Sequence, residues 1–171
     1  MVVINLFAGP GSGKSTTCAM IFAKLKLAGI NCEMALEYAK DKVWENSLDV
    51  LDDQIYVFGK QIHRLNRLKD KVDVIITDSP ILLSIIYDKE QNPILKALVL
   101  DQFSKFDNLN YYVTRDDTYN PKGRVQTLKE SIDKDNEIKN LLNDNNIDYK
   151  VFNKHDNVDI IIEDALKLLN K

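Results

Sequence analysis

A glycine-rich segment near the N-terminus narrows the choice of fold for this chain more than any other part of its sequence. Residues 8–16 read Ala-Gly-Pro-Gly-Ser-Gly-Lys-Ser-Thr, which fits the relaxed Walker A pattern with Ala8 in place of its first glycine. The apolar run at residues 2–7 predicts a strand before it, and apolar residues recur with helical spacing over residues 14–28. A strand, a glycine-rich turn and a helix in this order predict a site for a nucleoside triphosphate.

Each residue type in this segment has an expected role. Its glycines allow a tight backbone whose N–H groups point into one concavity, and the following helix adds its positive N-terminal end. The Lys14 ammonium can reach the β- and γ-phosphates, and the Ser15 hydroxyl can ligate Mg²⁺. We therefore expect ATP and Mg²⁺ as cofactors. The expected nucleotide-binding residues are Gly9, Gly11, Ser12, Gly13, Lys14, Ser15 and Thr16.

Strand-like runs alternate with segments of helical spacing along the remainder of the 171 residues. The predicted strands are residues 2–7, 31–37, 72–77, 109–114 and 147–152, and the predicted helices are residues 14–28, 49–69, 94–106, 127–142 and 157–170. This alternation predicts one α/β domain over residues 1–171, with a parallel sheet covered on both faces. Ligands of such sheets bind at the carboxyl ends of the strands.

Composition excludes several classes of protein. Apolar residues make up 44% of the chain and charged residues 29%, which excludes collagen-like and wholly disordered chains. A net charge of −3 argues against a dedicated nucleic-acid coat. No apolar run reaches membrane-spanning length, and the first strand follows Met1 directly, so we expect no membrane contact, no signal peptide and a cytoplasmic location. Cys18 and Cys32 stand apart and predict two reduced thiols.

Two acidic residues follow predicted strands. Asp78 ends the apolar run at residues 72–77, where an aspartate of such folds holds Mg²⁺ directly or through water. Glu37 ends the second predicted strand and could accept the proton of an attacking hydroxyl group, although it could equally be an ordinary polar strand end. Tyr38 and Trp44 could stack on a ring, but core packing is the more common role of such residues.

A polar stretch at residues 115–124 follows the fourth predicted strand and indicates a long loop. Arg115, Lys122 and Arg124 could close over a triphosphate and balance charge in the transition state. Gly123 and Pro121 favour such a role for Arg124, although loop arginines are often only solvated. We expect a lid loop here, with Arg124 as its catalytic residue.

The predicted helix at residues 49–69 has an apolar face of Leu51, Ile55, Phe58, Ile62 and Leu65. Its other side carries a basic stripe of Lys60, Arg64, Arg67 and Lys71. A stripe of this kind is usually a solvated face, and the alternative is a surface for an anionic substrate or partner.

These segments together resemble the NadR-type P-loop kinases, most closely the stand-alone members carried by bacteriophages. The resemblance rests on the glycine-rich segment, on Glu-Tyr-Ala-Lys at 37–40, on Ile-Thr-Asp-Ser-Pro at 76–80 and on Tyr-Asn-Pro-Lys-Gly-Arg at 119–124. It implies a P-loop kinase-like three-layer sandwich with a five-stranded parallel sheet and a short lid loop. It also implies ATP binding at residues 9–16, a metal-linked role for Asp78, a base or substrate contact at Glu37 and a lid role for Arg124.

The resulting hypothesis is an ATP-dependent kinase whose acceptor is a hydroxyl group of a nucleoside-like or nucleotide-like molecule, with Lys14, Glu37, Asp78 and Arg124 as catalytic residues. One alternative is a kinase that phosphorylates a hydroxymethylated pyrimidine base in phage DNA, in which case the location is the host cytoplasm. A further alternative is a switch ATPase that uses water as the acceptor. The sequence leaves the acceptor, the choice of ATP or GTP and the oligomeric state open, a homo-oligomer included.

Overall fold

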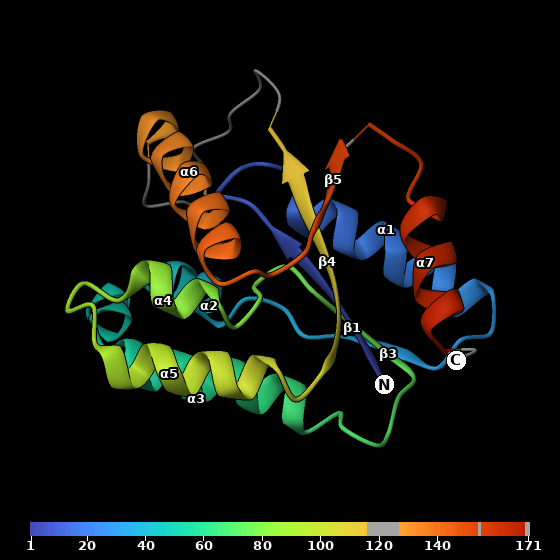
Figure 1. The fold of residues 1–171 in the computed structure, drawn as a ribbon, viewed down its shortest axis with the longest axis horizontal. Coiled ribbons are helices and arrows are strands. Elements are labelled where there is room, and N and C mark those ends of the chain that lie inside the picture. The colour runs from blue at the N-terminus through green and yellow to red at the C-terminus, as the bar shows by residue number, and fades with distance from the viewer. Residues whose placement is uncertain (116–126, 154, 170–171) are drawn as a thin grey trace.

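The structure, a computed structural model, describes residues 1–115, 127–153 and 155–169 (Figure 1). The described residues form one parallel sheet with the strand order β2-β3-β1-β4-β5. The strands are β1 (Val2–Phe7), β2 (Cys32–Met34), β3 (Val74–Thr77), β4 (Asp107–Thr114) and β5 (Lys150–Asn153). The helices are α1 (Lys14–Leu27), α2 (Tyr38–Trp44), α3 (Gln54–Asn66), α4 (Leu83–Tyr87), α5 (Pro93–Phe103), α6 (Leu128–Asp144) and α7 (Asp159–Leu169), with a short 3₁₀ helix η1 (Leu48–Asp52).

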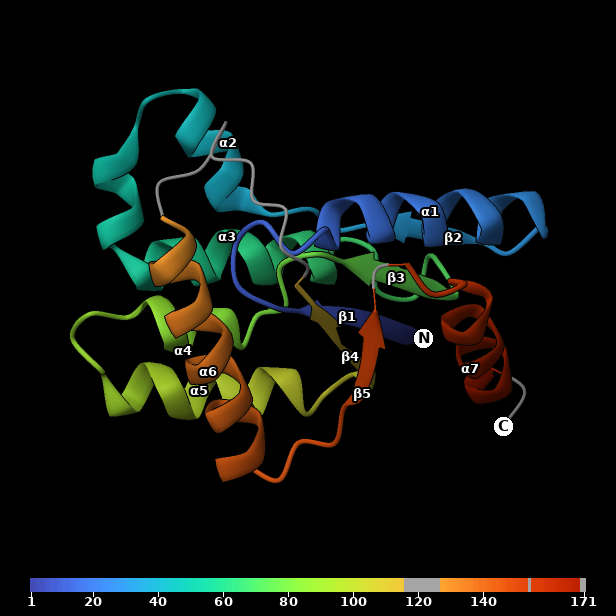
Figure 2. The ribbon, with the colours of Figure 1, turned by 90° about the horizontal axis from the view of Figure 1, so that it is seen from above.

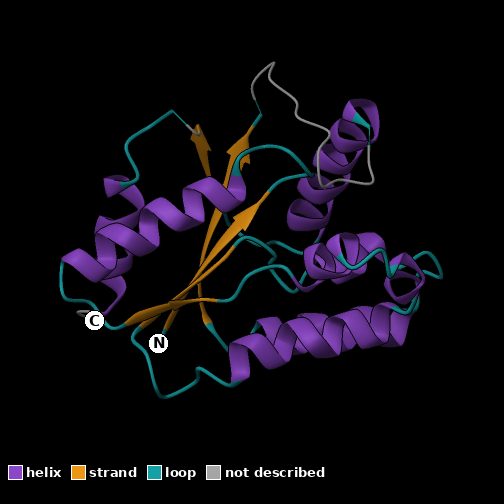
Figure 3. Ribbon diagram, turned by 180° about the vertical axis from the view of Figure 1, so that it is seen from behind, coloured by secondary structure: helices purple, strands orange, loops and turns teal. Residues whose placement is uncertain are grey.

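Helices cover both faces of the sheet, as Figure 3 shows. Along β1 the side chains alternate, so that Ile4 and Leu6 pack in a core with α1 and α7. Val3 and Phe7 point to the other face and pack with α3, α4, α5 and α6. Because β1 lies at the centre of the sheet and is buried on both faces, it has no polar face toward water. The predicted three-layer α/β sandwich with five parallel strands is confirmed.

The predicted helix at residues 49–69 is wrong at its N-terminal end. The structure has η1 followed by α3, separated at Asp53, whose side chain accepts a hydrogen bond from the Tyr56 N–H at 3.0 Å. An aspartate that bonds a backbone N–H three residues later begins a new helix. The predicted apolar face also shifts, because Ile55 is 62% exposed while Gln61 is buried.

Two helices of the structure, α2 and α4, were not predicted. They have seven and five residues, too few for an apolar repeat to show a helical period. In Figure 2, α1 begins at one edge of the sheet, and α2 lies beyond that same edge and covers neither face of the sheet. Helix α2 therefore lies at the edge of the sheet, whereas α4 contributes Leu83 to the core.

The structure also bears on the predictions for the two cysteines, for the second strand and for a membrane span. Cys18 and Cys32 are free and buried, as expected. Strand β2 is shorter than its predicted range, since it pairs only with β3. None of the helices in the described ranges combines the length and apolar character needed to span a bilayer. Most of the predicted lid loop, including Lys122, Gly123 and Arg124, lies outside the described residues.

Candidate active site

The glycine-rich loop connects β1 to α1 at the carboxyl edge of the sheet. Glycine is required at its different positions for different structural reasons. Gly11 and Gly13 have φ values of 83° and 97°, which side chains rarely allow. Gly9 is needed for space instead, because a Cβ atom there would lie 2.4 Å from the carbonyl oxygen of Ser131 in α6. Two glycines therefore shape the loop, and the third lets α6 approach it.

Lys14 is the first residue of α1, and its ammonium group lies along the loop. Its Nζ donates hydrogen bonds to the carbonyl oxygens of Ala8 at 2.8 Å and of Gly9 at 3.0 Å. Burial lowers the pKa of Lys14, and the carboxylates of Glu37 and Asp78 act in the opposite direction. The side chain thus forms a cationic group beside the cavity described below, in the position that a polyphosphate requires.

Ser15 and Asp78 form a second polar group. The Ser15 hydroxyl donates a hydrogen bond to Asp78 Oδ2 at 2.6 Å, and Asp78 is 3% exposed at the end of β3. Both are hard oxygen donors that open on the same cavity, which suits Mg²⁺. The described residues contain no group of three or more His, Cys, Asp or Glu side chains that could hold a metal by itself. Mg²⁺ bound here would complete its shell with phosphate and water oxygens.

Glu37 lies after β2 at the N-cap position of α2, where its side chain makes no capping hydrogen bond. Its backbone N–H donates to Asp78 Oδ1 at 3.1 Å, and Ala35, two residues earlier, is tied to β3 through hydrogen bonds with Ile76 and Thr77. Burial raises the pKa of Glu37, and the nearby Lys14 ammonium opposes that rise. A carboxylate of raised pKa is a better proton acceptor than an exposed one, which suits a general base.

One cavity of about 660 Å³ joins these groups and extends beyond them. Its size suits a nucleotide-sized or ring-containing ligand in addition to phosphate groups. Helices α2, α3 and α4 with η1 and the adjoining loops provide the rest of the wall. Those residues are Ala39, Lys40, Val43, Trp44, Leu48, Asp49, Leu51, Asp52, Gln54, Val57, Gln61, Leu83, Ser84, Tyr87 and Lys89.

The structure brings together seven of the residues that the sequence predicts at the site. The cavity is lined by Gly11, Gly13, Lys14, Ser15, Thr16, Glu37 and Asp78. Gly9 and Ser12 do not line it: the Gly9 N–H donates to Asp135 Oδ1 at 2.6 Å, and Ser12 is 1% exposed. Arg124 lies outside the described residues.

Trp44 and Tyr38, the two candidates for stacking on a ligand ring, have different environments in the structure. Trp44 is 65% exposed and lines the cavity, where its ring is available for stacking. Tyr38 is buried and makes an edge contact with the ring of Tyr56, with centroids 5.9 Å apart. Tyr38 therefore packs within the protein, as the more common reading of such a residue implies.

Sequence reasoning missed Gln61, Tyr87 and Asp135. Gln61 accepts a hydrogen bond from the Tyr38 N–H at 3.0 Å and so holds the chain after Glu37. Asp135 is 7% exposed on the inner face of α6. For Gln61 and Asp135 a signal was available: each is a polar residue at a position where the helical spacing predicts a buried side chain. Tyr87 lies in the five-residue helix α4, whose length hides any such pattern.

Comparisons with known proteins bear on the fold of the chain. No protein-family model matches the chain, and no curated protein matches it. Among solved structures it is similar to the deoxyadenosine kinase of M. mycoides, with a TM-score of 0.52 and 19% identity over 98% of both chains. It is also similar to the shikimate kinase of Aquifex aeolicus, with a TM-score of 0.50 and 14% identity over 98% of this chain and 96% of that one. The chain therefore has the P-loop kinase-like fold.

Proposed function

We propose that this protein is an ATP-dependent kinase that transfers the γ-phosphate of ATP to a hydroxyl group of a nucleoside-like or nucleotide-like acceptor. One observation carries the proposal: a single cavity is lined by the Lys14 ammonium, by the Ser15–Asp78 pair and by the half-buried carboxyl group of Glu37. The first two groups suit a metal-bound triphosphate, and the third suits removal of a proton.

In the proposed reaction each group at the site has one role. The loop N–H groups and Lys14 bind the phosphates, and Mg²⁺, held by Ser15 and Asp78, would neutralise part of their charge. The acceptor hydroxyl oxygen forms a bond to the γ-phosphorus while the bond from that phosphorus to the β,γ-bridging oxygen breaks, and ADP leaves. The hydroxyl proton passes to the Glu37 carboxylate. Arg124 is proposed to balance charge on the transferring group.

The part of the cavity beyond these groups supports an acceptor that contains a ring. Trp44 offers an exposed aromatic face, and Val43 and Leu48 add apolar wall. Both solved relatives described above are named for kinases of small molecules. We therefore place nucleosides and nucleotides first among the acceptors to be tested.

The test is ADP formation from ATP and Mg²⁺ with a panel of nucleosides and nucleotides, followed by identification of the phosphorylated product. Glu37→Gln keeps the shape of the side chain but cannot accept the proton, so kcat should fall by roughly 10²–10⁴-fold while the Kd for ATP stays within about twofold. Glu45→Gln, at the exposed C-terminal end of α2, is the matched control and should leave both values unchanged. Equal losses of kcat and ATP affinity in Glu37→Gln would make Glu37 a binding residue.

A second candidate acceptor is a hydroxymethylated pyrimidine in DNA. The observation in its favour is the Lys60 ammonium over the exposed Tyr56 ring, 5.1 Å from the centroid, because nucleic-acid surfaces combine cations with aromatic rings. Against it, Arg64 of the basic stripe already binds the Leu36 carbonyl oxygen and Asp41. Transfer of labelled phosphate to hydroxymethylated DNA and not to free nucleosides would favour this candidate. Steady ATP hydrolysis without any acceptor would instead favour a switch ATPase.

A further inference from the structure

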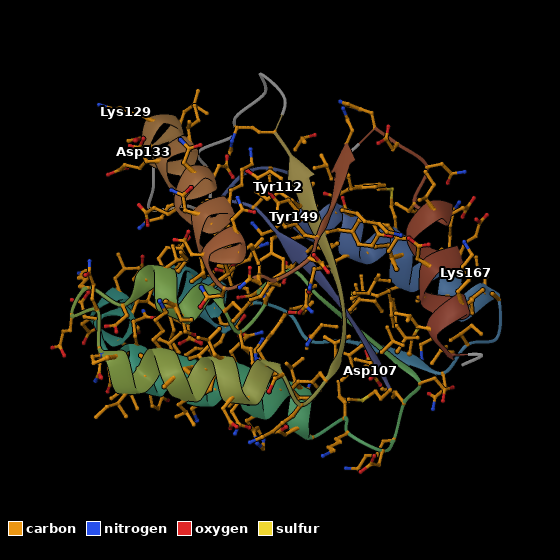
Figure 4. All side chains as sticks on the ribbon, viewed as in Figure 1. Asp107, Tyr112, Lys129, Asp133, Tyr149 and Lys167 are labelled. Atoms are coloured by element: carbon orange, nitrogen blue, oxygen red, sulfur yellow. The ribbon has the colours of Figure 1, made fainter. Side chains whose placement is uncertain are left out.

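A largely buried ion pair lies beside the glycine-rich loop, and neither of its residues lines the cavity. Arg115, the residue after β4, donates from Nε to Asp135 Oδ2 of α6 at 2.9 Å, and both side chains are about 10% exposed. Helix α6 packs against β4 in one core cluster, and the Lys139 ammonium of α6 lies 4.5 Å from the ring centroid of Tyr112 in β4. Tyr112 also contacts Tyr149, which precedes β5, with ring centroids 6.2 Å apart; both are labelled in Figure 4. Packing thus determines where the pair lies.

Each member of the pair also bonds the backbone of the loop. Asp135 Oδ1 accepts a hydrogen bond from the Gly9 N–H at 2.6 Å. Arg115 Nη1 donates to the carbonyl oxygen of Pro10 at 2.7 Å. The pair therefore holds two successive parts of the loop, and it does so from outside the cavity.

The first contact fixes the peptide unit between Ala8 and Gly9. In a trans peptide the N–H and C=O groups point in opposite directions, so an N–H bonded to Asp135 turns the Ala8 carbonyl the other way. That carbonyl oxygen accepts the hydrogen bond from Lys14 Nζ at 2.8 Å. Asp135 thereby determines where the Lys14 ammonium rests before a ligand binds.

The second contact fixes the peptide unit between Pro10 and Gly11. Because Arg115 holds the Pro10 carbonyl, the Gly11 N–H of the same unit points away from Arg115. Gly11 lines the cavity, so this direction is the one in which an N–H could donate to a phosphate oxygen.

We propose that Arg115 and Asp135 are positioning residues that set the glycine-rich loop in its polyphosphate-binding geometry. This inference rests on the proposed nucleotide site. Donors that are already aimed bind more tightly, because no ordering cost is incurred on binding. The pair is also poorly arranged for stability alone, since Arg115 Nη2 is buried without a hydrogen-bond partner in the described part of the chain.

The test compares polyphosphate affinity with stability in three variants. Arg115→Lys keeps the charge but loses the planar fork that reaches Asp135 and Pro10 together. Asp135→Asn keeps the shape and removes the charge, and it provides the same measurement if Arg115→Lys does not fold. Ile138→Val, at a fully buried apolar position of α6, is the control for a loss of core packing. The Kd is measured by calorimetry for ATP and for inorganic tripolyphosphate, and Tm is measured on the same samples.

We expect Arg115→Lys and Asp135→Asn to raise both Kd values about tenfold, equivalent to about 1.4 kcal/mol. Ile138→Val should lower Tm and leave both Kd values within twofold of the wild type. Variants of the pair that lower Tm but bind both probes as the wild type does would make the pair merely structural and overturn this inference alone. Failure of the wild type to bind either probe would overturn both this inference and the proposed nucleotide site.

Discussion

At Gly9, the addition of a single methyl group should strongly destabilise the fold. An alanine Cβ atom there would lie 2.4 Å from the Ser131 carbonyl oxygen, 3.0 Å from Asp135 Oδ1 and 3.2 Å from Arg115 Nη2. The first of these atoms belongs to the backbone of α6 and cannot rotate away. Gly9→Ala must therefore move α6 and the loop apart.

The size of the effect follows from those contacts. The closest one is roughly 1 Å shorter than ordinary van der Waals contact, and overpacking of this kind costs about 1–3 kcal/mol. The movement also lengthens the 2.6 Å hydrogen bond from the Gly9 N–H to Asp135, and losing a bond to a charged group costs about 1.5–3 kcal/mol. We expect Gly9→Ala to lower the free energy of unfolding by about 2.5–6 kcal/mol.

Gly59 provides a matched control with the opposite sign. It lies inside α3, and a Cβ atom there would have nothing within 4 Å. Replacing a helical glycine by alanine without a clash removes backbone freedom from the unfolded chain, so Gly59→Ala should raise stability by about 0.5–1 kcal/mol. Urea unfolding followed by circular dichroism measures both variants at a common pH and temperature.

A Gly9→Ala protein as stable as the wild type would refute the close approach of α6 to the loop. Loss of stability equal in Gly9→Ala and Gly59→Ala would refute the distinction between a glycine required for space and one that is not. Either result would also remove the geometric basis for the roles of Arg115 and Asp135.

Two further predictions concern the site and the pH dependence of stability. Lys14→Ala should reduce phosphoryl transfer roughly a hundredfold or more while Tm changes little, because its side chain binds loop carbonyls outside the core clusters; a large fall in Tm would contradict this. The hydrogen bond from Lys150, followed by that from the Tyr111 hydroxyl, lowers the pKa of Asp164 below its ordinary 3.8. Its contribution to stability is therefore complete above that value and is lost as pH falls through the lower folded-state pKa. Asp164→Asn should destabilise the protein at pH 7 and much less at pH 2.5 in urea unfolding, and an equal effect at both values would disprove the assignment.

The fold was predictable because its signals are local. Apolar strands, helical spacing and the glycine-rich turn can each be recognised within a short stretch of sequence, and the alternation of elements implies a parallel sheet. The prediction failed where an element was too short to show a period, as in α2, or where one side chain begins a new helix within an apolar repeat, as Asp53 does.

The site was predictable only in part, for a related reason. Asp78 follows β3 directly, and Lys14 and Ser15 begin the helix that the glycine-rich loop connects to the neighbouring strand β1, so their proximity at the sheet edge follows from the topology. The inner face of α6 was not predicted, because the apolar spacing was assigned to hydrophobic residues while the buried positions of this face include Ser131 and Asp135. Leu128 and Ile132, which the spacing favoured, are 41% and 45% exposed.

The amino-acid sequence alone determined the class of fold and the presence of a glycine-rich loop, because backbone conformation and the spacing of apolar residues are properties of residues near one another in the chain. Only the tertiary structure decided which distant side chain forms a hydrogen bond with the backbone of that loop. Gly9 and Asp135 are 126 residues apart, and the hydrogen bond between them exists because β4 and α6 pack around the central strand. Contacts of that kind depend on how whole elements pack, which no local pattern contains.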